Sequence, residues 1–82
     1  MHVERLAEDR DWYTLHYDPS KCQGDTVKAV FTNPEDGDKS AAGPTLNDGE
    51  ILCSVGAGHT GTDDIVVTGS EGGEDVGQGA FG

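Results

Sequence analysis

The sequence predicts an all-β protein, a small antiparallel barrel or sandwich of about four to six short strands. Short segments alternate apolar and polar residues, which is the period of a strand with one buried face. Turns rich in Gly, Pro and Asp separate these segments at intervals of roughly ten residues. No long segment has the period of a helix, which argues against helices packed on a sheet.

The first segment has the spacing of a short helix. In HVERLAEDR (residues 2–10), Val3, Leu6 and Ala7 lie three and four positions apart. So short a segment, without an N-cap residue, forms one or two helical turns at most. We therefore expect residues 1–11 to form a short helix or an N-terminal arm.

Residues 12–68 are expected to form the β domain. In WYTLHYD (residues 12–18), Tyr13, Leu15 and Tyr17 lie on one face of a strand. The same alternation, or a β-branched run bounded by glycine, predicts the remaining strands. They are residues 26–32, 44–46, 50–55 and 64–68.

Two connections carry strong turn signals. Residues 33–45 contain two prolines, two glycines and few bulky apolar side chains, so they predict a loop. Asp48-Gly49 favours the type I′ turn of a hairpin. This turn would pair residues 44–46 with residues 50–55.

The C-terminal residues 69–82 include six glycines. A segment of this composition is a flexible coil in isolation. Glycine lets a backbone lie close against another surface, and Val76 and Phe81 provide apolar side chains for such a contact. We therefore expect an extended, acidic C-terminal arm that clasps a neighbouring subunit.

The formal charge is −11 at pH 7, and all five basic residues lie in the first half of the chain. No basic stripe is present to neutralise phosphates, so direct binding to nucleic acid is not expected. Self-repulsion at such a charge destabilises a compact domain unless salt screens it. The acidic, lysine-poor composition is typical of a halophilic organism or its virus, although an ordinary acidic domain has the same features.

The core that this chain can form is small. Eighty-two residues make one domain, and the apolar burial of so short a chain roughly balances its loss of conformational entropy. A disulfide, a metal ion, high salt or a neighbouring subunit is therefore expected to add stability. The chain has little room for a substrate cleft, so we expect no enzymatic activity and no cofactor.

The two cysteines are the first candidates for chemistry. On a strand over residues 50–55, Cys53 shares a face with Ile51 and Val55, which predicts a packed, inert thiol rather than a nucleophile. The alternative is a disulfide between Cys22 and Cys53, closing a loop of roughly 30 residues. Against the disulfide, the chain has no export signal, and thiols stay reduced in the cytosol.

The candidate metal ligands are isolated from one another along the chain. Structural zinc sites usually present their ligands as close pairs, whereas His16, Cys22, Cys53 and His59 each stand alone. The acidic stretches do not fit the calcium loop of an EF-hand. We expect no dedicated metal site, only weak binding of cations by clustered carboxylates.

The stretch CSVGAGHTGTDD (residues 53–64) gathers reactive side chains between two predicted strands. Its glycine-rich part lacks the Lys and the following helix of a phosphate loop. We interpret His59 as a contact at the tip of this connection. Trp12 and His16 share the less buried face of their strand, which makes them candidates for a subunit contact.

The sequence shows no signal for a membrane or for export. No apolar run reaches the roughly 18 residues that cross a membrane as a helix, and the N-terminus lacks signal-peptide features. We therefore expect a location in the virion or the cytoplasm, without Sec-dependent secretion.

The favoured function is a non-enzymatic structural subunit of a larger symmetric assembly. A capsid-decoration, head-completion or tail-associated protein of a halophilic archaeal virus would fit this description. Its partners would be further copies or other protein subunits, with no membrane and no nucleic acid. The alternative is an acidic intracellular binding module, such as an inhibitor that mimics DNA.

Overall fold

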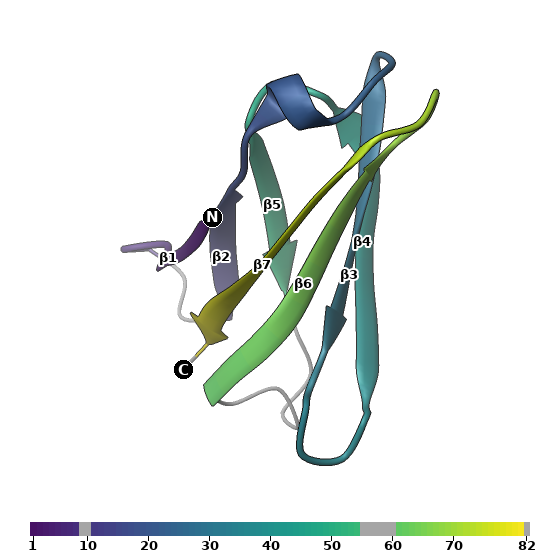
Figure 1. Cartoon of the computed structure of the whole chain (residues 1–82). Coiled ribbons are helices and arrows are strands. Elements are labelled where there is room, and N and C mark those ends of the chain that lie inside the picture. Colours follow the sequence, from purple (N-terminus) through teal and green to yellow (C-terminus); the bar gives the residue numbers. More distant parts are fainter. Residues whose placement is uncertain (9–10, 55–60, 82) are drawn as a thin grey trace.

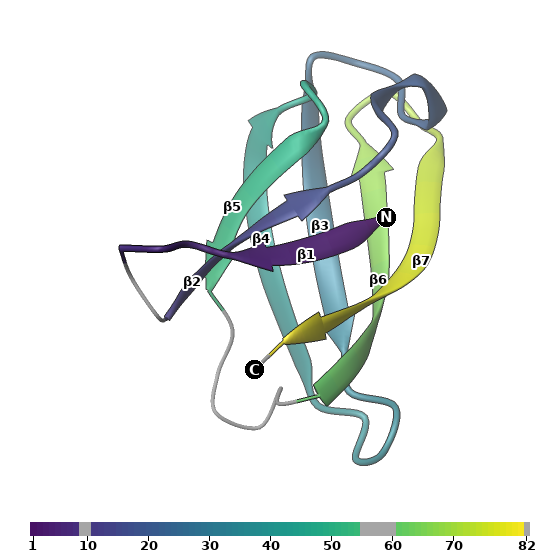
Figure 2. The same ribbon diagram turned by 90° about the vertical axis from the view of Figure 1, so that its left-hand side faces the viewer.

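Two antiparallel sheets pack face to face in the computed structural model, which describes residues 1–8, 11–54 and 61–81 (Figures 1 and 2). The first sheet consists, in spatial order, of β1 (His2–Arg5), β2 (Trp12–His16) and β5 (Glu50–Ser54). The second consists of β4 (Lys39–Leu46), β3 (Thr26–Thr32), β6 (Gly61–Gly69) and β7 (Glu74–Phe81). The predicted all-β architecture is confirmed, with seven strands in the described residues.

The order of the strands resembles that of immunoglobulin-type sandwiches, in which seven strands, A to G, form the sheets ABED and CFG. Here the fourth strand, β4, pairs with β3 instead of joining the sheet of β1, β2 and β5. Sandwiches of this kind serve many unrelated functions, so the architecture alone assigns none to this chain.

Alternation along each strand places apolar side chains between the sheets. In β3, Val27, Ala29 and Phe31 are buried, while Lys28 and Val30 are exposed on the outer face. The core confirms the inner faces predicted for the strands. Among the described residues it consists of Tyr13, Leu15, Tyr17, Cys22, Val27, Ala29, Phe31, Ile51, Cys53, Ile65, Val67 and Phe81.

The helix expected over residues 2–10 is wrong, because His2–Arg5 forms strand β1. This strand pairs with β2, with Val3 opposite Leu15, and Val3 packs against the core. The helical spacing covers too few residues to outweigh strand pairing and a half-buried valine. Residues 9 and 10 of the expected helix lie outside the described residues.

The C-terminal stretch is a strand of the larger sheet rather than an arm toward a neighbouring subunit. Residues 74–81 pair with β6 from end to end. Phe81 is 3% exposed, and its ring meets those of Tyr13 and Phe31 edge-on at centroid distances of 5.0 and 5.3 Å. Phe81 therefore packs in the core of its own chain, and pairing with β6 orders the glycine-rich segment.

Strand β1 lies against β7 at one side of the sandwich, with the N-terminal end of β1 beside β7 (Figure 2). A Cβ atom on Gly79 would overlap the side chain of Val3 and come within 2.8 Å of Ile65 Cδ1. A Cβ atom on Gly77 would lie 3.1 Å from Met1 Cβ. These two glycines therefore leave the space that the N-terminal strand fills.

The structure differs from two expectations, the loop over residues 33–45 and the hairpin at Asp48-Gly49. β4 begins at Lys39 and pairs with β3, so part of the predicted loop over residues 33–45 is a strand. Ala42 of β4 packs against the core, which stabilises this pairing. The Asp48-Gly49 turn leads from β4 to β5 in the other sheet, so it is a crossover and not a hairpin.

Asn47 fastens this crossover to the connection between β2 and β3. Its side-chain carbonyl accepts a hydrogen bond from the Tyr17 hydroxyl (2.8 Å), and its amide donates to the carbonyls of Cys22 (3.1 Å) and Gly24 (3.3 Å). Its backbone N–H donates to the carbonyl of Asp25 (2.9 Å). One side chain thus holds together two connections that are far apart in the sequence.

Asp75 joins the same end of the sandwich to β7. Its Oδ2 accepts a hydrogen bond from the Asp18 N–H (3.0 Å), and its Oδ1 lies 3.6 Å from Lys21 Nζ in the 3-10 turn η1 (Pro19–Lys21). Cys22, next to this turn, forms an antiparallel bridge with Gly73. The buried carboxylate of Asp75 is therefore stabilised by a backbone donor and a nearby ammonium group.

Replacing Asn47 should test how much this end contributes to stability. We predict that Asn47→Ala lowers the free energy of unfolding by about 2 kcal/mol, because it leaves partly buried partners without their hydrogen bonds. Urea unfolding monitored by Trp12 fluorescence measures the change. Gln78→Ala is the matched control, because the Gln78 amide donates to the exposed Asp64 (2.8 Å). This variant should change stability by less than about 0.5 kcal/mol. Equal effects of the two variants would contradict the role of Asn47.

Candidate functional site

The predicted contact residues fall on different parts of the sandwich. Trp12 (38% exposed) and His16 lie on the outer face of the three-stranded sheet, whereas Val76 lies on the outer face of the four-stranded sheet. Phe81 is in the core, and His59 lies outside the described residues. The structure therefore keeps Trp12 and His16 on one surface but does not bring Val76 to them.

Val76 belongs to an apolar row that crosses the whole four-stranded sheet. Ala41 lies opposite Val30, Val30 opposite Val66, and Val66 opposite Val76. Val30 is 39% exposed and Val76 is 61% exposed, with Val66 half-buried between them. We call these four residues the valine row. The sequence alone does not reveal it, because its members come from four strands whose order and register depend on distant pairing.

Polar side chains lie on both sides of the valine row. On one side, Lys39, Thr32, Asp64 and Gln78 follow one another across the four strands, and the Gln78 amide donates to Asp64 (2.8 Å). On the other side, the next outward positions are occupied by Lys28, Thr68 and Glu74. The outer face of this sheet is therefore an apolar stripe with polar borders.

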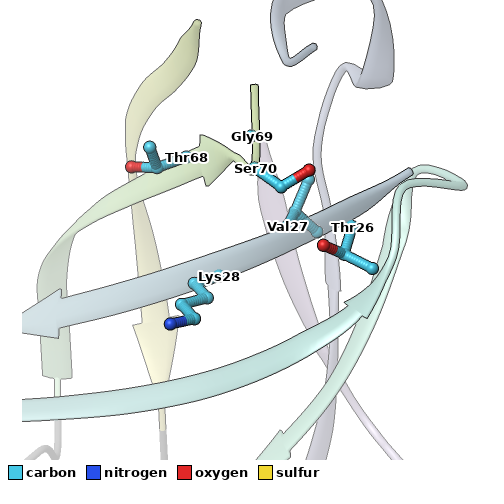
Figure 3. A pocket seen from close by; sticks show the side chains of 6 residues that line it. All are labelled: Thr26, Val27, Lys28, Thr68, Gly69 and Ser70. Carbon is cyan, nitrogen blue, oxygen red and sulfur yellow. The ribbon is translucent and has the colours of Figure 1, made fainter. Parts of the chain in front are cut away.

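A pocket of about 330 Å³ lies beside this stripe, at the start of β3 and the end of β6 (Figure 3). Its walls contain three hydroxyl groups and one ammonium group, and they contain no carboxylate or imidazole. Such a pocket can form hydrogen bonds with a small polar group, but its lining has no general base. The residues that line it are Thr26, Val27, Lys28, Thr68, Gly69 and Ser70.

Cys22 and Cys53 are both buried free thiols, so the disulfide alternative does not hold in this structure. Cys53 lies on β5, whereas Cys22 follows η1, and its thiol donates a hydrogen bond to the carbonyl of Val67 (3.5 Å) in the other sheet. Burial raises the pKa of Cys22 and raises that of Cys53 to about 11. A thiol with a raised pKa is rarely ionised near neutral pH and is a poor nucleophile.

His16 stands in a group of ionisable side chains on the outer face of the three-stranded sheet. Its ring stacks on that of His2 at a centroid distance of 4.3 Å, and its Nε2 lies 3.1 Å from Glu4 Oε1. Its Nδ1 lies 3.6 Å from Glu50 Oε1. Of the described residues, His2, Glu4 and His16 bring metal-ligating atoms close together. Sequence reasoning selected His16 but missed its neighbours, which the pairing of β1, β2 and β5 places beside it.

The ligand set weighed from the sequence does not come together. Cys22 and Cys53 are buried in the core, whereas His16 is on an outer face, and His59 is outside the described residues.

Within the described residues, no helix is long and apolar enough to span a membrane. Comparisons with models of protein families, with curated proteins and with solved structures give no match.

The buried thiol of Cys53 should make stability depend on alkaline pH. The pKa rises from 9.0 to about 11 on folding, so the unfolded chain loses this proton first. The contribution of this pKa difference to the free energy of unfolding is fully present below pH 9 and is lost as the pH rises through 11. We predict that Cys53→Ala makes the fall in unfolding free energy over this range shallower, as measured by urea unfolding at several pH values. An unchanged slope would contradict the burial of this thiol.

Proposed function

We propose that this chain is a non-enzymatic structural subunit of a larger symmetric assembly, and that it contacts a neighbouring protein subunit through the valine row. The observation that carries the proposal is the exposure of Val30 and Val76, 39% and 61%, on either side of Val66 on one sheet face. Contiguous apolar side chains on a surface contribute to stability when a second surface covers them.

The borders of the valine row support contact with a protein. Asp64 and Gln78 lie on one side, and Thr68 and Glu74 lie on the other. Protein interfaces commonly combine an apolar centre with a polar rim that stays in contact with water. Two sheets also pack well face to face, because the side chains of aligned strands interdigitate. A second copy of this chain, or a subunit with a similar face, would suit the row.

The net charge of −11 determines where such an assembly would form. Copies of this chain repel one another at low ionic strength, and salt removes most of that repulsion because the Debye length falls to about 3 Å at 1 M. The acidic, lysine-poor composition supports a halophilic setting. We therefore favour a virion component, such as a capsid-decoration protein of a halophilic archaeal virus, over a cytoplasmic assembly.

An inhibitor that mimics DNA is the lower-ranked candidate. The net charge supports it, but a mimic needs carboxylates in rows on an open face. The open face of the four-stranded sheet is instead crossed by Ala41, Val30, Val66 and Val76. This arrangement favours a neighbour with an apolar surface over a basic partner.

Substituting the valine row tests the proposed contact. We predict that the wild-type chain associates as salt rises from about 0.1 to 3 M, and that the double variant Val30→Thr with Val76→Thr stays monomeric. Threonine keeps the β-branched shape that strands favour but makes the row polar. Light scattering and native mass spectrometry measure the association.

Leu52→Thr is the matched control for this experiment. It removes a side chain that is 60% exposed on the outer face of the other sheet, and it should leave association unchanged. A wild-type chain that stays monomeric at every salt concentration would overturn self-assembly through the row. Loss of association in Leu52→Thr alone would move the contact to the other sheet.

Salt should also change the stability of the isolated chain. We predict that its melting temperature rises as salt increases, because screening reduces repulsion among the acidic side chains. Circular dichroism during heating measures the midpoint in dilute solution, and sodium chloride and potassium chloride should act alike. A melting temperature that does not change with salt would argue against the halophilic setting. A DNA mimic is distinguished by a different measurement, because it would lose its basic partner as salt rises.

A further inference from the structure

We propose that His2, Glu4 and His16 bind one divalent transition-metal ion, and that Zn²⁺ is the preferred ion. The site lies on the outer face of the three-stranded sheet. It is independent of the proposed assembly function, because the valine row is on the opposite side of the sandwich.

Strand pairing assembles the three ligands. His2 on β1 lies directly opposite His16 on β2, and Glu4 follows His2 by two positions, so all three side chains are on one face. One ligand atom from each side chain lies within 4.8 Å of the others. The sandwich therefore brings the three groups together from two neighbouring strands rather than from a flexible loop.

The distances suit a small ion with short bonds. A tetrahedral Zn²⁺ ion with bonds of about 2.0–2.1 Å holds its ligand atoms about 3.3 Å apart. His16 Nε2 and Glu4 Oε1 are already 3.1 Å apart. The ring of His2 is stacked on that of His16 with an interplanar angle of 13°, so it must turn to direct a nitrogen at the ion. His2 is exposed, so solvent rather than the core surrounds much of its side chain.

Glu50 is placed to orient His16. It lies opposite His16 on β5, with its Oε1 3.6 Å from Nδ1. A metal-binding histidine commonly donates its second ring N–H to a carboxylate, which fixes the tautomer and directs the other nitrogen at the metal. At 3.6 Å the two atoms are just beyond hydrogen-bond distance. Glu50 therefore acts as a positioning residue once a small side-chain movement closes this contact, and Nε2 is the nitrogen that binds the ion.

The ligand types select the metal. Two imidazoles and one carboxylate suit Zn²⁺ and neighbouring transition metals, whereas Ca²⁺ and Mg²⁺ prefer sites made of oxygen ligands. Three protein ligands leave one coordination position of Zn²⁺ for water. The charge of −11 attracts cations in general, so selectivity for Zn²⁺ over Ca²⁺ distinguishes a built site from a diffuse acidic surface.

Calorimetric titration of the metal-free full chain with ZnCl₂ tests the site. We expect one ion per chain, with affinity lowered more than tenfold by His16→Ala or His2→Ala and about tenfold by Glu50→Gln. His59→Ala is the matched control, because it removes the third imidazole of the chain and should leave the affinity unchanged. Histidine NMR signals provide a second readout, in which Zn²⁺ shifts the ring resonances of His2 and His16.

Some outcomes would overturn the proposal. Equal Zn²⁺ affinity in His16→Ala and the wild type would remove His16 from the site, and loss of binding in His59→Ala alone would assign the ion elsewhere. Displacement of Zn²⁺ by an equal concentration of Ca²⁺ would indicate only a diffuse acidic surface. Matching melting temperatures of metal-free wild type and His16→Ala are required, so that weak binding is not a result of unfolding.

Discussion

The packing of Phe81 between Tyr13 and Phe31 is the contact on which the rest of the structure depends. The rings come from three strands and both sheets, and they meet edge-on in the interior of a small core. To bring Phe81 there, the glycine-rich C-terminal segment must pair with β6 along its whole length. Strand β7 then provides the surface against which Met1 and Val3 pack at its glycines. Pairing with β2 and contact with β7 together position β1, and with it the histidine cluster of His2, Glu4 and His16.

The same alternation that forms the core also specifies the two outer faces. β3 turns Phe31 inward and Val30 outward, and β2 turns Leu15 inward and His16 outward. A shift of one residue in either strand would exchange the faces and expose the core. The valine row and the histidine cluster are therefore as strictly positioned as the core, although both are at the surface. They lie on opposite sides of the sandwich, so the contact proposed for the valine row would not obstruct the metal site proposed for the histidine cluster.

Local patterns predicted the parts of the fold that depend on local sequence. The alternating segments 12–18, 26–32 and 50–55 match β2, β3 and β5 closely, because their buried residues are bulky and evenly spaced. The segments at both termini were mispredicted, since four residues of β1 and a glycine-rich β7 become strands only by pairing with distant partners. The neighbours of His16 were missed for the same reason. Register between strands is a property of the whole fold and is not visible in a short window of sequence.

The edge strand β4 has a further consequence for the way in which copies of this chain can meet. An exposed sheet edge is a template to which another strand can add by backbone hydrogen bonds, and this is a common route to fibres. Pro44 has no N–H to donate, and Lys39 places a charge at the start of the strand. This edge therefore resists the addition of a foreign strand. At high concentration, the chain is protected at β4 against uncontrolled growth into amyloid-like ribbons.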